Sequence, residues 1–284
     1  MTSDRPSWAP ESIDLDRPNA ARVYDYLLGG AANFETDRVF ADKLVEMMPQ
    51  ARPAARLNRA FLRRAVRFCV EAGIDQFLDI GSGVPTAGNV HEVAPSAKVL
   101  YVDNEPVAVA HSQVLLEENG DLERHAVINA DLRNPDRLWQ RVIQTGVIDM
   151  EQPVALMFIA VLHVLQFDGD GVDMTLRAMS RYRELLPAGS YLAISHGTSD
   201  GVPDDIAEQL AELKRMYDSS SSPVLWRPRN EIRKYFGDFE LLPPGMSWSA
   251  DWHPEETGPN SPVIEFDQPN QAVIWGGIGR KRVV

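Results

Sequence analysis

The chain has 284 residues, of which 44% are hydrophobic and 24% charged, enough apolar material for the core of one large domain or two small ones. Its 28 basic and 41 acidic side chains give a formal charge of −13. Because a surface this acidic repels phosphate groups, we expect neither nucleic acid nor an anionic membrane as a partner.

The first 73 residues predict a helical extension. Residues 1–18 are rich in Pro, Asp and Ser and contain no apolar segment of the kind that a signal peptide needs. Helices are predicted over residues 20–30, 36–48 and 54–72. The third helix carries the single cysteine, Cys69, at a buried spacing, which excludes an intrachain disulfide and a cysteine-based zinc site. It also carries an arginine row, either a solvated face or a cationic surface facing substrate or the acidic body: Arg56, Arg59, Arg63 and Arg67.

From residue 74 onward, short apolar runs alternate with helical segments. Strands are predicted at 76–80, 98–103, 125–131, 154–165 and 190–197, and helices at 84–94, 106–119, 135–146 and 172–186. This alternation predicts a parallel, doubly wound α/β sheet with helices on both faces. The longest apolar run, 154–165, is shorter than the roughly 18 residues of a membrane span, so we expect a soluble, cytoplasmic protein.

The C-terminal part predicts a helix with Ile206, Leu210, Leu213 and Tyr217 on one face, a helix near 229–236, and strands at 239–244 and 271–279. About 25 residues between these strands include Trp248 and Trp252, which either line an acceptor pocket or pin a long loop. We therefore predict one α/β domain, residues 74–284, behind the helical extension, residues 1–73.

The strongest motif is FLDIGSGVPT, residues 77–86, in which a strand leads into Asp79 and the chain turns at Gly81 and Gly83. Asp103 ends the next strand about 20 residues later, where nucleotide-binding βαβ units carry the acid that binds ribose hydroxyls. Pro85 removes an N–H from the turn, and Asp79 puts a negative charge where a diphosphate would lie. The motif therefore favours a cationic nucleoside without phosphate, S-adenosylmethionine, over a dinucleotide.

The third strand is followed by Asp131 and Leu132. Asp131 is predicted to accept a hydrogen bond from the adenine amine, and Leu132 to cover the ring. The alternative is that Asp103 and Asp131 only cap the helices that follow them.

Most of the chain, residues 17–280, resembles the S-adenosyl methyltransferase family common in actinobacteria. The similarity rests on residues 17–38, 57–68, 79–94 and 101–107 and on Ala160-Val161-Leu162-His163. It implies an enzyme with the Rossmann-like class I methyltransferase fold, with seven strands of which the last is antiparallel. Glu105 stands where the family pattern has aspartate. The resemblance also implies S-adenosyl-L-methionine bound by Asp79, Gly81, Gly83, Asp103, Asn104, Asp131, Leu132 and Ala160.

Candidates for acceptor handling lie in two regions. His163, after the fourth strand, is the candidate for orienting an acceptor hydroxyl or taking its proton, and the alternative is a packed histidine. The segment from Tyr24 to Asp37 predicts either a lid over the cofactor or an ordinary helix end. No pair of histidines has metal-ligand spacing, so no metal is expected. Further candidates for substrate binding are Tyr24, Tyr26, Asn33, His196 and Trp248.

These features together predict a methyltransferase that transfers a methyl group to an O or N nucleophile of a small organic acceptor by in-line displacement. One alternative is an NAD(P)-dependent oxidoreductase, against which Pro85 and Thr86 count. The other is a non-catalytic regulatory module that binds S-adenosylmethionine. The oligomeric state is left open.

Overall fold

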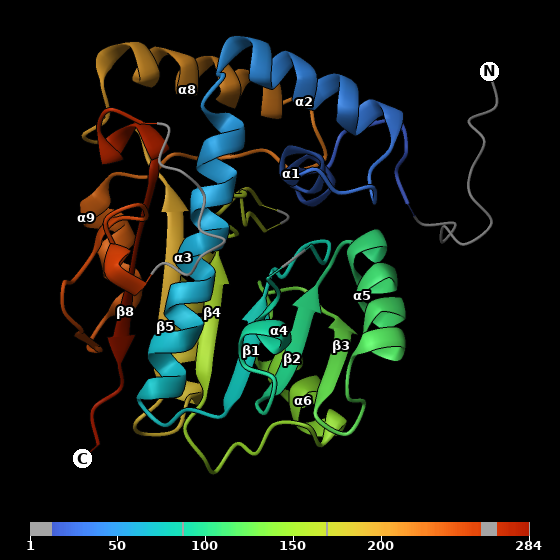
Figure 1. Ribbon diagram of the computed structural model, residues 1–284, viewed down its shortest axis with the longest axis vertical. Coiled ribbons are helices and arrows are strands. Elements are labelled where there is room, and N and C mark those ends of the chain that lie inside the picture. The colour runs from blue at the N-terminus through green and yellow to red at the C-terminus, as the bar shows by residue number, and fades with distance from the viewer. Residues whose placement is uncertain (1–12, 87, 169, 257–265, 284) are drawn as a thin grey trace.

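The computed structural model describes residues 13–86, 88–168, 170–256 and 266–283. Its centre is an eight-stranded sheet with the strand order β3-β2-β1-β4-β5-β8-β6, and β7 pairs with β8 off this path (Figure 1). Strands β1 to β5 are parallel, whereas β8 is antiparallel to β5, β6 and β7. The strands are β1 Gln76–Ile80, β2 Lys98–Asp103, β3 His125–Asn129, β4 Ala155–Ile159, β5 Tyr191–Gly197, β6 Glu240–Leu241, β7 Ser247–Trp248 and β8 Ile274–Arg280.

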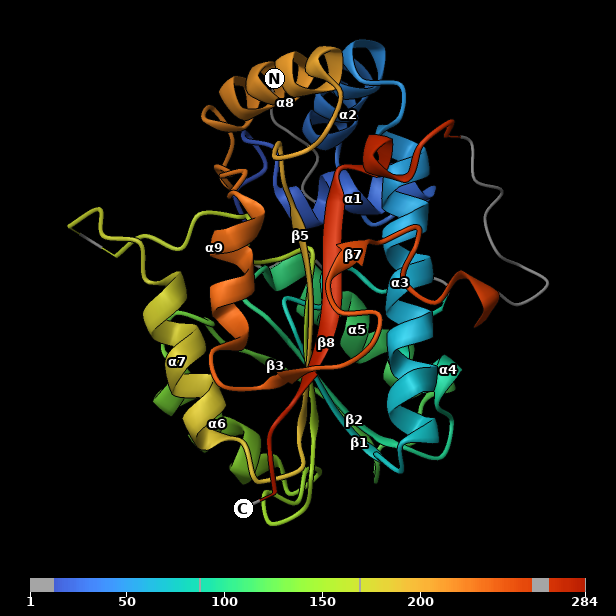
Figure 2. The ribbon, with the colours of Figure 1, turned by 90° about the vertical axis from the view of Figure 1, so that its left-hand side faces the viewer.

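Helices cover both faces of this sheet, because its central strands are apolar on both sides (Figure 2). One face packs against α3, α4 and α5, and the other against α6, α7 and α9. The predicted class I methyltransferase fold is confirmed. The helices of these two layers are α3 Ala51–Glu71, α4 Val90–Val93, α5 Pro106–Asn119, α6 Pro135–Thr145, α7 Thr175–Leu185 and α9 Arg229–Arg233.

Several predicted boundaries were wrong. Within the predicted helix 84–94, the described residues form a helix only over Val90–Val93, and the predicted strand 154–165 ends at Ile159. Helix α3 begins at Ala51 rather than at residue 54, because Pro53 is tolerated in a first helical turn. Parts of the predicted N-terminal stretch and of the long insertion, residues 1–12 and 257–265, lie outside the described residues.

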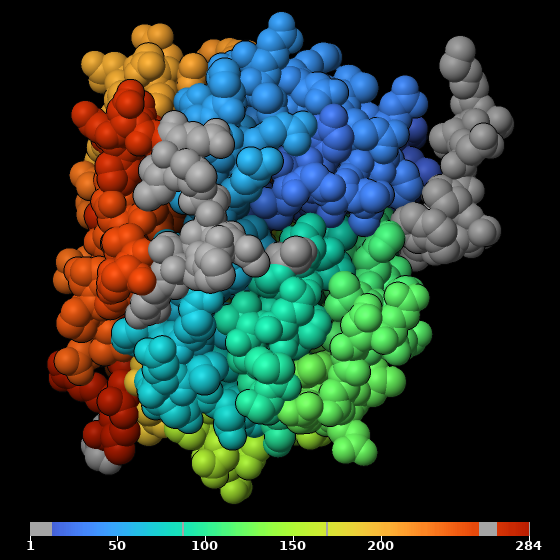
Figure 3. Space-filling model, viewed as in Figure 1, coloured from blue at the N-terminus to red at the C-terminus, as the bar shows by residue number. Residues whose placement is uncertain are grey.

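Three helices form a cover over the carboxyl ends of the parallel strands (Figures 1 and 2). They are α1 (Ala20–Leu28), α2 (Glu35–Met47) and α8 (Asp204–Tyr217), and they share one apolar cluster with the start of α3. The N-terminal segment also packs on the first turn of α5 through Ile13 and Val107, and Figure 3 shows the blue and green segments in direct contact there. The N-terminal helices α1 and α2 and the later helix α8, far apart in sequence, therefore cover the carboxyl ends of the parallel strands together.

An ion-pair cluster joins this cover to the sheet. Arg22, on α1, is 1% exposed, and its Nε lies 2.8 Å from Oδ2 of Asp37 on α2. Its Nη1 lies 3.0 Å from Oε1 of Glu105, which follows β2. Its Nη2 donates to the carbonyl oxygens of Asp14 and Arg17. A buried guanidinium with every nitrogen engaged holds α1, α2, the preceding segment and the sheet in one arrangement.

A second buried arginine fixes the C-terminal insertion. Arg64, on α3, donates to the backbone carbonyls of Trp252 and Ser249. The Trp252 ring is fully buried and lies 5.3 Å from the ring of Phe61. Cys69, on the same helix, is buried as predicted. Among the helices that the structure describes, none has the length and apolar character needed to cross a bilayer.

We expect Arg22→Ala to lower the free energy of unfolding by about 3–5 kcal/mol, because it leaves the buried carboxylates of Asp37 and Glu105 without their cation. Urea unfolding measures the change. The control is Arg17→Ala in the same segment, whose ion pair with Asp14 is exposed and should cost less than about 1 kcal/mol. Equal losses in the two variants would contradict a structural role for the buried cluster.

Candidate functional site

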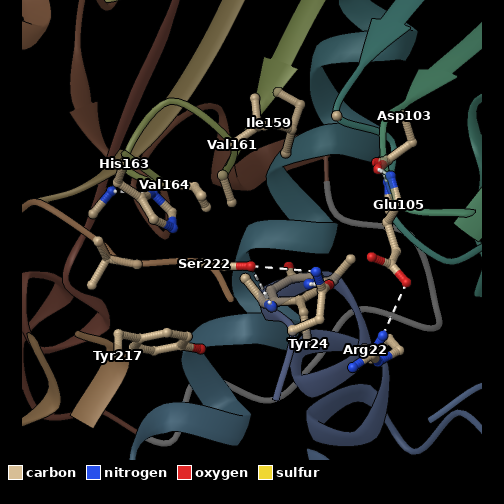
Figure 4. A pocket seen from close by; sticks show the side chains of 18 of the residues that line it. Arg22, Tyr24, Asp103, Glu105, Ile159, Val161, His163, Val164, Tyr217 and Ser222 are labelled. Atoms are coloured by element: carbon tan, nitrogen blue, oxygen red, sulfur yellow. Dashed lines mark hydrogen bonds and ion pairs between the residues drawn. The ribbon is translucent and has the colours of Figure 1, made fainter. Parts of the chain in front are cut away.

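A cavity of about 520 Å³ lies between the carboxyl ends of the parallel strands and the helical cover (Figure 4). Ligands of open α/β sheets bind at this edge of the sheet. One end of the cavity is polar and is formed by the residues that follow β1, β2 and β3. The other end is apolar and is formed by α2, α3 and α8.

The turn after β1 forms the floor of the polar end. Gly81 and Gly83 have φ angles of 72° and 66°, a region that L side chains rarely adopt. A Cβ at Gly81 would lie 2.2 Å from Cγ2 of Val161, so the turn has no room for a side chain there. The amides of Gly81 and Ser82 both donate to the carbonyl oxygen of Val102, which ties this turn to β2.

Asp79 is buried at the base of the turn, and its carboxylate accepts no hydrogen bond from the residues that the structure describes. Burial raises the pKa of Asp79 to about 7, with nearby Arg59 opposing this and Asp103 adding to it. A buried carboxylate without a partner is a fitting acceptor for a ligand ammonium group.

Asp103 lies at the end of β2 and lines the same cavity. Its Oδ2 accepts from the Gly83 amide at 2.8 Å and its Oδ1 from the Glu105 amide at 2.8 Å. Burial raises the pKa of Asp103, while these backbone donors oppose the rise. Each carboxylate oxygen keeps a further lone pair for a ligand hydroxyl, and Asn104 lines the cavity beside it.

The third predicted acid is not brought into the cavity. Strand β3 ends at Asn129, and the Asp131 carboxylate is held by the Arg133 guanidinium, with Nε–Oδ2 at 2.9 Å and Nη2–Oδ2 at 2.6 Å. Burial acts to raise the pKa of Asp131, but Arg133 holds it below its usual value. Leu132 and Arg133 line the cavity and Asp131 is not among the described lining residues.

The end of β4 lies between the polar and the apolar ends. Ala160 has a φ of 56°, and its amide donates to Oγ of Ser195 at 2.9 Å. Ser195 donates in turn to Oδ1 of Asn58 at 2.7 Å, and the Asn58 amide donates to the Tyr24 hydroxyl at 2.9 Å. Tyr24 donates to the carbonyl oxygen of Ala55. This chain of hydrogen bonds fixes Tyr24 of the cover against the β4 edge, where both Ala160 and Tyr24 line the cavity.

His163 lines the cavity four residues beyond β4, and its Nδ1 accepts from the Gly197 amide at 3.1 Å. Burial, together with the smaller effect of the buried Arg227 cation, lowers the pKa of His163 to about 4. The imidazole is therefore neutral at pH 7, and because Nδ1 is the acceptor, the proton is on Nε2.

Four predicted substrate residues are not among the described lining residues of this cavity. Tyr26 donates to Asp42 on the outer side of the cover, and Asn33 donates to Asp25 within the turn after α1. His196 is fully buried behind His163, with Nδ1 2.6 Å from the Gly197 carbonyl oxygen. Trp248 packs edge-on against Trp275 on β8. In this structure, the side chains of these four residues hold the fold together.

Several lining residues were missed as individual site residues, among them Arg59 and Tyr217. Arg59 belongs to the predicted arginine row, but it is 8% exposed and lines the cavity near Asp79, while Arg56 is exposed. Tyr217 was predicted only as part of the apolar face of its helix, and it lines the apolar end. Its phenolic hydroxyl is the one polar atom on that face, and this could have marked Tyr217 as a site residue in the sequence. The described residues contain no cluster of His, Cys, Asp and Glu fit for a metal ion.

Comparison with known proteins gives a consistent result. The model of the S-adenosyl methyltransferase family matches residues 6–282. A Thermobifida fusca protein described as a candidate methyltransferase shares 38% identity, with a TM-score of 0.81 over 98% of this chain and 100% of that one. A DUF574 family protein from Streptomyces avermitilis shares 32% identity, with a TM-score of 0.81 over 94% and 99% of the two chains.

An O-methyltransferase family protein from Burkholderia thailandensis, 13% identical, shares the fold with a TM-score of 0.51 over 82% of this chain and 57% of that one. No protein with a curated description matches the chain. The match of the family model over nearly the whole sequence decides between the predicted alternatives in favour of a methyltransferase that uses S-adenosylmethionine. The chain belongs to the S-adenosyl methyltransferase family.

Proposed function

We propose that this enzyme transfers the methyl group of S-adenosylmethionine to an oxygen or nitrogen nucleophile of a small organic acceptor in the cytoplasm. The observation that carries the proposal is the continuous cavity, which runs from two buried carboxylates at the sheet edge, past Ala160 and Val161, to an apolar end under the cover. Its volume of about 520 Å³ lies in the range of small-molecule sites. The acidic surface argues against a nucleic-acid acceptor.

The polar end suits the proposed cofactor. Asp79 would hold the ammonium group, Asp103 the ribose hydroxyls with Asn104 beside it, and Leu132 one face of the adenine. Gly81 and Gly83 leave the floor free of side chains. When bound, S-adenosylmethionine supplies a methyl group on a sulfonium sulfur that departs as a neutral thioether. The residues of the chain would hold the acceptor and the cofactor in line, and such positioning can lower the activation barrier by about 7–11 kcal/mol.

Helices α1 and α2 of the cover belong to the extension of residues 1–73, which we propose as a lid that would exclude water from this reaction. Tyr24 is held at the cavity by Asn58 and Ala55. The loop after α8 closes the same side, because the Ser222 hydroxyl accepts from the Ala20 amide at 3.2 Å and from the Asn19 side chain at 3.3 Å (Figure 4). Entry and release of ligands would require these contacts to open.

We expect Asp103→Ala to weaken the binding of S-adenosylhomocysteine at least about tenfold, because two hydrogen bonds from ribose to a carboxylate are lost. Calorimetric titration measures the dissociation constant. Asp136→Ala, which removes an exposed carboxylate on α6, serves as the control and should leave the constant unchanged. Unchanged affinity in Asp103→Ala would mean that Asp103 only braces the turn through the amides of Gly83 and Glu105.

We expect Asp79→Asn to stabilise the ligand-free protein at pH 8 by roughly 1–3 kcal/mol and to weaken S-adenosylhomocysteine binding. The pKa of Asp79 in the folded protein, about 7, lies above the ordinary value of 3.8. Above pH 7 the carboxylate is ionised in both states and its burial disfavours folding, whereas at pH 5 the folded protein holds a proton there. Urea unfolding should therefore show a gain that shrinks from pH 8 to pH 5. A gain that does not depend on pH would contradict this account.

A further inference from the structure

The apolar end of the cavity, here called the chamber, carries no charged side chain among its described lining residues. Its walls come from α1, α2, α8 and the loop after α8, and include Leu27, Leu44, Met48, Leu210, Leu213 and Val224. The charged lining residues lie toward the polar end or in the segment before and at the start of α1. An acceptor that carries a fixed charge apart from its reacting oxygen would lose the hydration of that charge in the chamber without gaining a counter-ion.

Tyr217 and His163 are two of the polar groups that interrupt the apolar wall. Tyr217 is 8% exposed, and its hydroxyl forms no hydrogen bond with the described residues. Figure 4 shows this hydroxyl turned into the cavity, with the His163 imidazole on a neighbouring wall. The Gly197 amide engages Nδ1 of His163, so the proton is on Nε2, and this N–H likewise has no partner among the described residues. Both groups are available to a ligand.

Both groups are suited to donate a hydrogen bond rather than to remove a proton. The lone pair of His163 Nδ1 is occupied by the Gly197 amide, and Nε2 carries the proton. Burial keeps the pKa of His163 low, and burial raises the pKa of Tyr217, so both side chains are neutral at pH 7. Two neighbouring donors are committed: the Tyr24 hydroxyl donates to Ala55 and the Trp226 indole N–H to Leu210.

From this arrangement we infer that the acceptor is an otherwise uncharged phenol or enol, bound as its oxyanion between the Nε2–H of His163 and the hydroxyl of Tyr217. This inference rests on the proposed function and names its substrate class. A site with donors and no base selects a hydroxyl that ionises readily by itself. A phenol, with a pKa near 10, meets this requirement, and an aliphatic alcohol does not.

The reaction balances without a protein base. The O–H bond of the acceptor breaks and its proton leaves to solvent water. The oxygen electron pair then forms the new O–C bond with the methyl carbon, while the C–S bond breaks and its electron pair stays on sulfur. The two donors stabilise the oxyanion before transfer. Of the two roles predicted for His163, this proposal keeps the orienting of the acceptor, through a hydrogen bond that His163 donates, and not the removal of its proton.

A matched set of naphthalene compounds tests the substrate class: 2-naphthol, 2-naphthylmethanol, 2-naphthylamine and 2-naphthoic acid. Each is incubated with the full-length protein and S-adenosylmethionine at neutral pH, and the methylated product is quantified. We expect methylation of 2-naphthol alone. Methylation of the alcohol, the amine or the acid in preference to 2-naphthol would overturn the inference and leave the proposed function standing.

Variants separate a donor from a base at position 163. His163→Gln keeps an oxygen to accept from the Gly197 amide and an N–H to donate, but it cannot take a proton, whereas His163→Leu lacks both groups. For 2-naphthol we expect kcat/KM to fall roughly 10- to 100-fold in His163→Leu and Tyr217→Phe, and much less in His163→Gln. Equal losses in the Gln and Leu variants would identify His163 as a base. The control, Tyr235→Phe, removes a buried phenol hydroxyl outside the cavity.

A binding measurement does not depend on turnover. The probe is 4-nitrophenol, whose absorption reports its ionisation, titrated with protein saturated with S-adenosylhomocysteine at the pH where half of the free probe is ionised. We expect the bound probe to shift toward the phenolate, and Tyr217→Phe to reverse the shift. A shift of the wild-type complex toward the neutral phenol, or no shift, would overturn the inference. If no naphthalene compound is methylated, this binding measurement decides whether the inference stands. Failure of the wild type to bind S-adenosylhomocysteine would instead contradict the proposed function.

Discussion

The closed cavity of this protein depends on one buried cation. Arg22 joins Asp37 on α2 to Glu105 behind β2 and also holds the carbonyl oxygens of the preceding segment. Because a buried charge is costly unless its partners are in place, the cover has one favourable position relative to the sheet. Glu105, directly after β2, is the residue through which Arg22 reaches the sheet.

The distribution of charged residues divides the cavity into two ends. Ionisable groups gather at the sheet edge, where Asp79 and Asp103 are buried beside an amide-rich turn. Under the cover, the described walls are apolar apart from a few hydrogen-bonding groups. This division suits the cationic nucleoside that we propose at the first end and the uncharged acceptor that we propose at the second. The β4 edge at Ala160, braced by Ser195 and Asn58, separates the two.

Sequence reasoning predicted well where the signal was local. The alternation of apolar and amphipathic segments predicted how strands and helices follow one another along the chain. The motif around Gly81 and Gly83 lies at the cavity floor as expected. It predicted poorly where a side chain had two competing partners. Asp131 follows its strand as an adenine ligand would, but Arg133, two residues later, holds its carboxylate instead. Likewise, Trp248 and His196 have the residue types of a binding site and pack within the fold.

The sequence by itself determined the family, the class of fold and the polar end of the cavity, because each depends on residues that are close together along the chain. Only the tertiary structure decided the acceptor end. Its walls come from α1, α2, the start of α3, α8 and the loop after α8, and more than a hundred residues separate α3 from α8. The tautomer of His163 was decided in the same way. Its proton lies on Nε2 because the backbone of Gly197, on a different strand, occupies Nδ1.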